Sequence, residues 1–313
     1  MTYKKKIICL SSLIAVLALL YTGSLVFNPE RSNNKNASYT WLDPKLAGKV
    51  DRIVINLQEQ KIELLRKNNT WFALYNGSEY PARKARIEDF ISIFATRSAW
   101  PVRASDASSH WKFGLEGETS SRLTIYGENS VYLDILFGDN DKTGREIYVR
   151  RFGNDEVRLG DNTFISYIDG TAASWYNLRF FPESEDGKIS LQDVQRLSLY
   201  NEGETVIFTR TNRNWEVSGV NNPDMKKIED YISTVLNSEG DDFLDSVSSN
   251  DPELNHSRIV IEFGNGKIST IRVSKADEVN RRFAHVSGSN YIYAIPLWVS
   301  VRILKNAASF EKQ

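Results

Sequence analysis

The chain has 313 residues, which is long enough for two domains of ordinary size. Its formal net charge of −1 shows no excess of lysine and arginine, which argues against a nucleic-acid-binding face. The single cysteine, Cys9, excludes an intrachain disulfide. Three histidines far apart in sequence are a poor supply for a metal site, so we expect neither a metal nor another cofactor.

The N-terminus carries a membrane-type signal. The lysines of "KKK" at 4–6 precede an uncharged, mostly apolar run from Ile7 to Phe27. A helix spans a bilayer with about 20 such residues, whereas a cleavable signal has an apolar region of about 7–15 residues and a small-residue cleavage site. The sequence therefore favours an uncleaved transmembrane anchor over a cleaved signal or a buried core helix. Lysines stay in the cytoplasm, so we expect an inner-membrane protein with residues 28–313 in the periplasm.

Composition divides the rest of the chain. The expected segments are the cytoplasmic lysines and anchor (1–27), a polar tether (28–46), a first repeat (47–181), a linker (182–193), a second repeat (194–304) and a tail (305–313).

The two repeats are predicted from matching strand patterns. Residues Val50–Leu74 align without a gap with Val194–Ser218, and this alignment matches Trp71 with Trp215. Alternating apolar residues and Asn-rich turns predict three strands in each segment. A second match, 121–138 with 257–274, predicts a further hairpin in each repeat, and "NG" at 265–266 favours a type I′ turn.

Each repeat also contains a nearly identical hexamer, "IEDFIS" at 87–92 and "IEDYIS" at 228–233. Apolar residues around the first recur at helical spacing, so we expect an amphipathic helix that covers a sheet. The neighbouring carboxylates Glu88 and Asp89 would point about 100° apart on its solvated face and cannot act as an acid–base pair. Lysines four residues before an acid, as in Lys84–Glu88 and Lys226–Asp230, predict weak ion pairs.

Each repeat therefore reads β-β-β-α-β-β-β-β-α, with closing helices near 162–167 and 296–307. This order predicts an α+β fold of two homologous repeats, each a mainly antiparallel sheet covered by helices, after the N-terminal transmembrane helix.

Chemical motifs are absent from the sequence. No nucleophile elbow, phosphate-binding glycine loop or H-E-x-x-H zinc motif is present. The run Asp139–Asp141 in "GDNDKTG" offers oxygen ligands for calcium, but it lacks the closing Glu of an EF-hand loop, and a hairpin loop is favoured. We therefore expect a protein that is not an enzyme.

The tryptophans suggest core anchors and a contact surface. Trp71 and Trp215 occupy the same position in the two repeats and are expected in the cores. Trp111, Trp175 and Trp298 lie near element ends, where they would pack at the seam between the repeats or form a partner surface.

Several segments, "VDRIVI", "TWFAL", "FGLEGETSSRLTIYG" and "FGDNDKTGREIYVRR", resemble the bacterial domain-of-unknown-function family 4340. The second half departs from this pattern, with "DPEL" at Asp251–Leu254 in place of "FGLEG". The resemblance implies a membrane-anchored, repeated extracytoplasmic region, often beside the ATPase, permease and auxiliary protein of a gliding-motility-type ABC transporter. It implies no active site.

We therefore expect a non-enzymatic, membrane-anchored accessory protein that docks onto an ABC-transporter permease or auxiliary subunit, or onto another cell-envelope complex. The alternative is a module that binds a lipid, glycan or peptide in the groove between the repeats. An envelope enzyme with an unfamiliar site is the third hypothesis.

Overall fold

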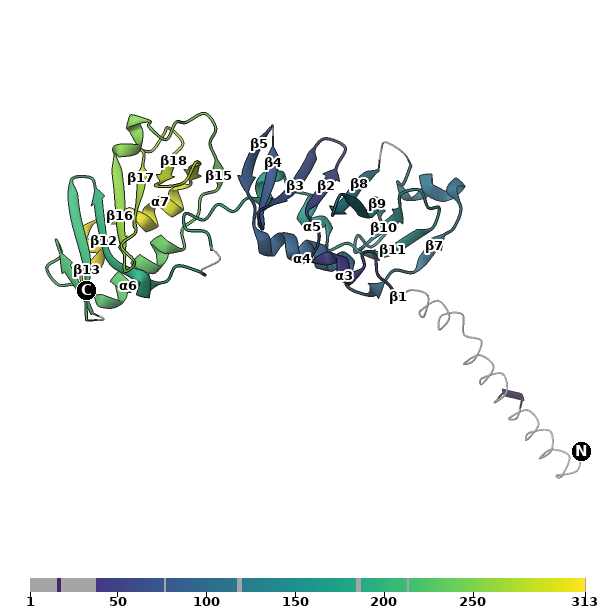
Figure 1. The fold of residues 1–313 in the computed structure, drawn as a ribbon, viewed down its shortest axis with the longest axis horizontal. Coiled ribbons are helices and arrows are strands. Elements are labelled where there is room, and N and C mark those ends of the chain that lie inside the picture. The colour runs from purple at the N-terminus through teal and green to yellow at the C-terminus, as the bar shows by residue number, and fades with distance from the viewer. Residues whose placement is uncertain are drawn as a thin grey trace, which may run out of the picture. The chain divides into compact units, whose positions relative to one another are not determined.

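The computed structural model describes residues 16–17, 38–75, 77–116, 120–183, 187–212 and 214–312. It divides the chain into two compact units, Met1–Trp175 and Tyr176–Gln313 (Figure 1). The boundary lies six residues before the predicted end of the first repeat at 181. Each unit has its own sheet and its own core.

Alternating strands build the sheet of the first unit. Its strands are β2 (Arg52–Asn56), β3 (Lys61–Lys67), β4 (Thr70–Tyr75), β5 (Ser78–Pro81), β7 (Val102–Ala104), β8 (Ser121–Gly127), β9 (Ser130–Asn140), β10 (Glu146–Arg151) and β11 (Val157–Asp161). Among the described residues these nine strands form one antiparallel sheet in the order β5-β4-β3-β2-β8-β9-β10-β11-β7. Ile62 and Leu64 of β3 are fully buried two residues apart, as expected for a strand with one face on a core.

Helix α4 (Lys84–Ala95) packs on one face of this sheet. Its buried residues have the predicted helical spacing and are Ile87, Phe90, Ile91 and Phe94. The ring of Phe94 lies 5.4 Å from that of Phe164, which lies 5.5 Å from Phe137 of β9. The predicted amphipathic helix is confirmed, and Lys84 pairs with Glu88 at 3.8 Å on its exposed side.

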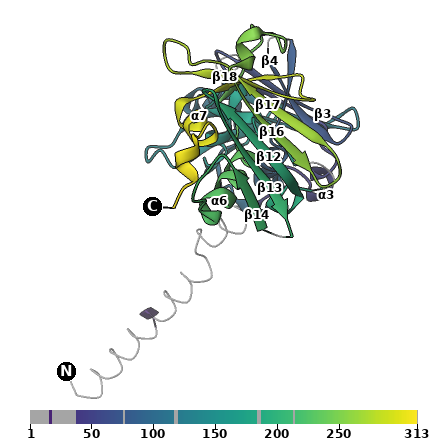
Figure 2. The ribbon, with the colours of Figure 1, turned by 90° about the vertical axis from the view of Figure 1, so that its left-hand side faces the viewer.

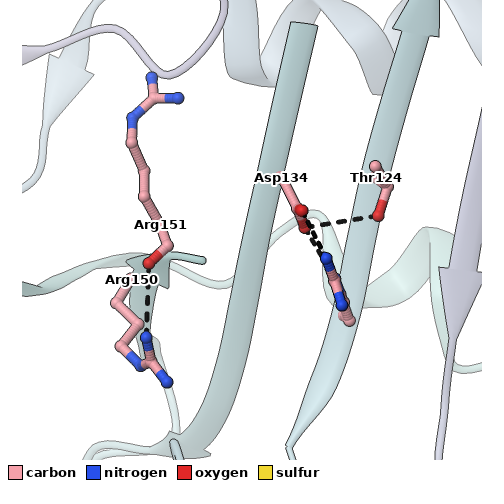
Figure 3. A network of polar contacts seen from close by, with 5 residues as sticks. Thr124, Asp134, Arg150 and Arg151 are labelled. Carbon is pink, nitrogen blue, oxygen red and sulfur yellow. Dashed lines mark hydrogen bonds and ion pairs between the residues drawn. The ribbon is translucent and has the colours of Figure 1, made fainter. Parts of the chain in front are cut away.

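The other face of the first sheet carries polar side chains that bind one another (Figure 3). Arg122 of β8 donates to both carboxylate oxygens of Asp134 on β9, at 2.8 and 2.6 Å, and Thr124 donates to the same carboxylate at 3.4 Å. Arg150 and Arg151 follow each other on β10 and point to opposite sides of the strand (Figure 3). Both donate to backbone carbonyl groups of the same unit.

Part of the predicted tether belongs to the first unit. Strand β1 (Ser38–Tyr39) pairs with β6 (Ser98–Ala99), and helix α3 (Pro44–Ala47) follows. Between them, Trp41 and Leu42 are buried, and their N–H groups donate to the carbonyl of Phe94 at 3.1 and 2.9 Å. These contacts fix residues 38–46 against the C-terminal end of α4.

The second unit repeats the same sheet (Figures 1 and 2). Its strands are β12 (Val194–Asn201), β13 (Glu204–Thr211), β14 (Asn214–Ser218), β15 (Asp242–Phe243), β16 (Ser257–Phe263), β17 (Ile268–Val273), β18 (Arg282–Val286) and β19 (Ile292–Ile295). Among the described residues they follow the order β14-β13-β12-β16-β17-β18-β19-β15, with helix α6 (Met225–Leu236) in the place of α4. The order matches the first sheet except that β14 has no neighbour equivalent to β5.

The predicted α+β class is wrong. Among the described residues, strand residues exceed helical residues, 41% against 23%. The closing helix expected near 162–167 is reduced to α5 (Ile165–Ile168), of four residues. The predicted order omitted the short strands β5, β6 and β7 of the first unit and β15 of the second, and the helices are too few and too short to cover the sheets, so the described part of the chain is mainly β.

The predicted membrane anchor is also corrected. In the part of the chain that the structure describes, no helix is long and apolar enough to cross a bilayer. The run from Ile7 to Phe27 lies outside this part, apart from Val16 and Leu17. The structure therefore does not support the predicted single-pass location in the inner membrane.

Candidate functional site

Helix α7 (Leu297–Ile303) of the second unit is short, and its exposed face carries large apolar side chains. Val299 and Ile303 lie four residues apart and are buried, as expected for one face of a helix. The exposed side chains on the other face are Leu297 (52% exposed), Trp298 (57%) and Val301 (54%). We call this set the α7 patch.

Helix α6 lies beside α7 and is fixed by two local contacts. The Asp224 carboxylate accepts hydrogen bonds from the N–H groups of Lys226 and Lys227 at 3.0 and 3.3 Å, which caps the helix. The Tyr231 hydroxyl donates to the carbonyl of Ile303 at 2.9 Å and joins the two helices. Burial raises the pKa of Tyr231, so this group remains a neutral donor.

The closing segments of the two units correspond to each other. Residues 162–175 align without a gap with 297–310 and end in "AASW" and "AASF". Both tetrapeptides form 3-10 helices, η3 (Ala172–Trp175) and η6 (Ala307–Phe310), and the aromatic residue that ends each of them is buried. The carbonyl groups of Trp175 and Phe310 accept 2.8 Å hydrogen bonds from Arg83 and Asp224, at the starts of α4 and α6.

This correspondence separates the buried positions of the closing segments from the exposed ones. The buried positions are apolar in both units, with Phe164 matching Val299 and Ile168 matching Ile303. The patch positions are polar in the first unit, where Asn162, Thr163 and Ser166 match Leu297, Trp298 and Val301. The aligned positions are therefore polar in one unit and apolar in the other, although Asn162 and Thr163 precede α5 whereas Leu297 and Trp298 belong to α7.

A groove runs between α6 and α7 beside this patch. One part has a volume of about 400 Å³ and includes Trp298, Val299 and Asn237 in its lining. A second part of about 320 Å³ includes Tyr231 and Phe310. Thr234 and Arg302 line both parts, so the two form one groove, which we call the α6–α7 groove.

In the first unit, aromatic rings occupy the space beside α4. The Tyr167 ring lies 5.6 Å from Phe90 and 6.2 Å from Trp175, and the Arg86 guanidinium lies 4.7 Å above it. Tyr167 corresponds to Arg302, whose guanidinium instead lies over the exposed ring of Trp298 at 5.3 Å. Replacement of the tyrosine therefore leaves the groove beside α6 open.

Positive charges gather at one end of the groove. Lys227, Arg302 and Lys305 line the part of about 320 Å³ together with a single acid, Asp230. Among the described residues, Arg302 and Lys305 form no ion pair with any acidic side chain, and the Lys227 ammonium donates to the carbonyl of Glu311 at 2.8 Å. The expected Lys226–Asp230 pair does not form, so Asp230 also stays without a cationic side-chain partner in the described part of the chain.

The three tryptophans singled out from the sequence have different environments. Trp298 lies in the α7 patch, and Trp111 is 61% exposed on a 3-10 helix, η1 (Ala107–Phe113), of the first unit. Trp175 is fully buried, with its ring against Phe90 and Tyr167, so it is a core residue and provides no partner surface. Of the three, Trp298 is the one that the structure places beside the α6–α7 groove.

Other polar groups have local structural partners. The Asp141 carboxylate accepts hydrogen bonds from the backbone N–H groups of Thr143, Arg145 and Glu146. Partial desolvation opposes the shift, but these bonds dominate and lower the pKa of Asp141 to about 2. The run Asp139–Asp141 thus caps a hairpin loop, and the described residues contain no group of three or more potential metal ligands of the His, Cys, Asp and Glu types.

The comparisons with known proteins identify the family. The model of the family described as "Domain of unknown function (DUF4340)" matches residues 71–256, more than half of the chain. The chain belongs to this family. Searches of curated proteins and of solved structures found no match.

Family segments in the first unit mark close packing. Gly138 of β9 lies where an added Cβ would stand 2.0 Å from the carbonyl oxygen of Phe113, so only glycine lets η1 cross the strand at this distance. Gly114 ends η1 in the left-handed region, at φ 66°. Leu115 is buried against Leu136 and Val157. Gly114, Leu115 and Gly138 therefore have packing roles in the first unit.

The α7 patch itself was not predicted, apart from Trp298. The sequence signal for it was the gapless alignment of 162–175 with 297–310, in which polar residues align with apolar ones. The predicted boundary between the second repeat and the tail at 305 divides this match, because "AASF" lies at 307–310.

Proposed function

We propose that this DUF4340 protein is a non-enzymatic docking protein and that the α7 patch of its second unit binds a partner protein. The observation that carries the proposal is the replacement of three polar positions of the first unit by Leu297, Trp298 and Val301 in the second.

The energetic argument concerns exposed apolar surface. Full burial of a large aliphatic or aromatic side chain contributes about 1.5–3 kcal/mol relative to its exposed state. The α7 patch forgoes this contribution in the free protein, whereas a partner that covers it would recover part of it. Tryptophan is also enriched among the residues that dominate binding energy at protein interfaces.

The partner follows from the family resemblance. We propose a component of an ABC transporter, a permease or an auxiliary subunit. Binding of a lipid, glycan or peptide between the repeats stays a prediction. Docking of a partner protein requires no catalytic residue.

Site-specific photo-crosslinking tests the proposal in cells that produce the full chain. A photoreactive amino acid is placed at position 298, at the equivalent position 163 of the first unit, and at position 111, where a tryptophan of similar exposure lies elsewhere. We expect a crosslinked partner at 298 alone, identified by mass spectrometry as a transporter component. Crosslinks at 163 or 111 without one at 298 would refute the α7 patch as the docking surface.

Titration of the identified partner then measures the contribution of Trp298 to the binding free energy. Trp298→Ala should weaken binding by about 2 kcal/mol, or roughly 30-fold, as expected for a central interface tryptophan. Trp111→Ala is the matched control and should leave the affinity unchanged. Equal affinities for wild-type protein and the Trp298 variant would contradict the proposal.

A further inference from the structure

We infer that the segment bound at the α7 patch is an acidic peptide segment of the partner, in which an apolar side chain is flanked by carboxylates. This inference rests on the proposed function and adds the chemistry of the partner. The apolar side chain would lie beside Trp298 in the α6–α7 groove, and the carboxylates would lie at Arg302 and Lys305.

Charge complementarity carries the inference. The first unit has Tyr167 and Gly170 at the positions of Arg302 and Lys305, so the second unit carries two cations together with the α7 patch. Both cations line the groove, and among the described residues neither forms an ion pair with an acidic side chain. Cations that lack an acidic side-chain partner beside an apolar surface favour a partner that brings both carboxylates and an apolar group.

The shape of the groove distinguishes a peptide from an anionic membrane surface. Exposed tryptophan with lysine and arginine is also a feature of membrane-surface helices. Here the surface is a groove between two helices rather than a flat face. A concave site of about 400 Å³ also fits a side chain of a bound peptide, whereas a bilayer surface cannot enter it.

A peptide selection on the full chain tests the chemistry even while the partner is unidentified. Phage-displayed random 12-residue peptides are selected on wild-type protein after depletion on the Trp298→Ala variant. The enriched peptides are synthesised and titrated against wild-type protein, Arg302→Glu, Lys305→Glu and the control Arg103→Glu, which changes an exposed arginine of the first unit. Vesicles of phosphatidylglycerol are tested in parallel by co-sedimentation.

The expected result is enrichment of peptides with an apolar residue between Asp or Glu residues. Each charge reversal at 302 or 305 should weaken their binding about tenfold or more, as for the loss of a close charge pair, while Arg103→Glu leaves it unchanged. Replacing the peptide acids by lysine should restore binding to the Arg302→Glu variant and abolish binding to the wild type.

The outcomes separate the inference from the proposed function. Peptides that need Trp298 but carry no acids, and that bind the charge-reversal variants normally, overturn the inference and leave the docking function standing. Failure to enrich any peptide that depends on Trp298 overturns both. Vesicle binding that depends on Trp298, without peptide enrichment, assigns the α7 patch to an anionic membrane instead.

Discussion

Single residues in this protein are held by contacts that depend on their ionisation state, and His285 of β18 is the clearest example. Its Nδ1 lies 3.0 Å from Arg272 Nη2, and its Nε2 lies 3.0 Å from the carbonyl of Ser289. These partners suit a neutral ring that accepts from the arginine and donates to the carbonyl. Desolvation and the nearby arginine lower the pKa of His285 below its ordinary value, and the bond to Ser289 only partly offsets them.

The lowered pKa of His285 predicts a pH-dependent stability. Below its ordinary pKa of 6.5, the unfolded chain binds a proton that the folded protein does not, so the stability falls as the pH decreases from 6.5 toward the lowered pKa. His285→Gln should reduce the change in Tm measured between about pH 7.5 and pH 5. The same substitution at the exposed His256 is the control, and an equal effect of the two variants would contradict this account.

At the scale of elements, the crossing of η1 over β9 depends on a residue without a side chain. A methyl group at position 138 would overlap the backbone of Phe113 and Gly114. We expect Gly138→Ala to lower the free energy of unfolding of the first unit by about 2 kcal/mol or more, in the range of overpacked sites. Urea denaturation followed by circular dichroism measures this free energy of unfolding.

Gly48, at the end of α3, provides the control for this substitution. It has a helical φ of −71°, and an added Cβ would meet no atom within 4 Å. Gly48→Ala should change the free energy of unfolding by no more than about 0.5 kcal/mol. Equal free energies of unfolding for Gly138→Ala and Gly48→Ala would contradict the close approach of η1 to β9.

The 3-10 helix η6 (Ala307–Phe310) closes the core of the second unit. The Phe310 ring lies 5.0 Å from Phe208 and 4.9 Å from Tyr231 and is almost fully buried. Phe310→Ala should therefore destabilise this unit by about 3–5 kcal/mol, as other buried phenylalanine truncations do. Chemical denaturation monitored by tryptophan fluorescence gives the value.

Leu297→Ala is the counterpart on the exposed face of α7. Because Leu297 is 52% exposed, its truncation should alter the free energy of unfolding by about 0.5 kcal/mol at most. A large loss would show that the α7 patch stabilises the unit rather than being available to a partner.

Local patterns predicted the elements better than the class of fold. The hairpins followed from strand alternation, and the amphipathic helices followed from helical spacing. In the Asn-rich turn at Asn68–Asn69, both φ angles are positive, at 47° and 65°. At 265–266 only Gly266 has a positive φ, so the predicted type I′ turn is wrong although the hairpin forms. In this turn the N–H of Gly266 donates to the carbonyl of Phe263 at 2.9 Å, and the Asn265 side chain accepts from the N–H of Lys267 at 3.0 Å.

Long-range packing escaped the sequence analysis. Residues 38–46 and 305–313 are polar enough to resemble a tether and a tail, yet Trp41, Leu42 and Phe310 anchor them in the cores. The groove could not be predicted, because it depends on how α6 and α7 pack and on a side chain, Arg302, that leaves space where Tyr167 fills it. Of the predicted surface residues, Trp175 is buried, whereas Trp111 and Trp298 are exposed.

At the scale of the whole molecule, the division after Trp175 determines which residues complete each unit. Residues 176–181 pack with the second unit, where the N–H of Phe180 donates to Ser238 at 3.0 Å and the N–H of Gly240 donates to Leu178 at 2.9 Å. The Phe180 ring also lies 5.2 Å from Tyr293. The segment predicted as the end of the first repeat is therefore part of the other core.

Two fragments test this division. Residues 176–313 should fold alone and unfold cooperatively in urea, because they contain a complete core. Residues 194–313, which begin at the predicted repeat boundary, lack Leu178 and Phe180 and should have a lower midpoint of unfolding. Equal midpoints for the two fragments would show that residues 176–193 add nothing to the second unit.

The end of the second sheet has a consequence for the behaviour of the protein at high concentration. Strand β14 lacks the neighbour that β5 provides for β4, and the described residues pair it on one side only. An unpaired strand edge recruits other chains into intermolecular sheets, and an exposed charge such as Glu216 counteracts this by repelling an identical edge. Neutralising the charge of Glu216 would then increase aggregation of the folded protein at high concentration without disturbing either core.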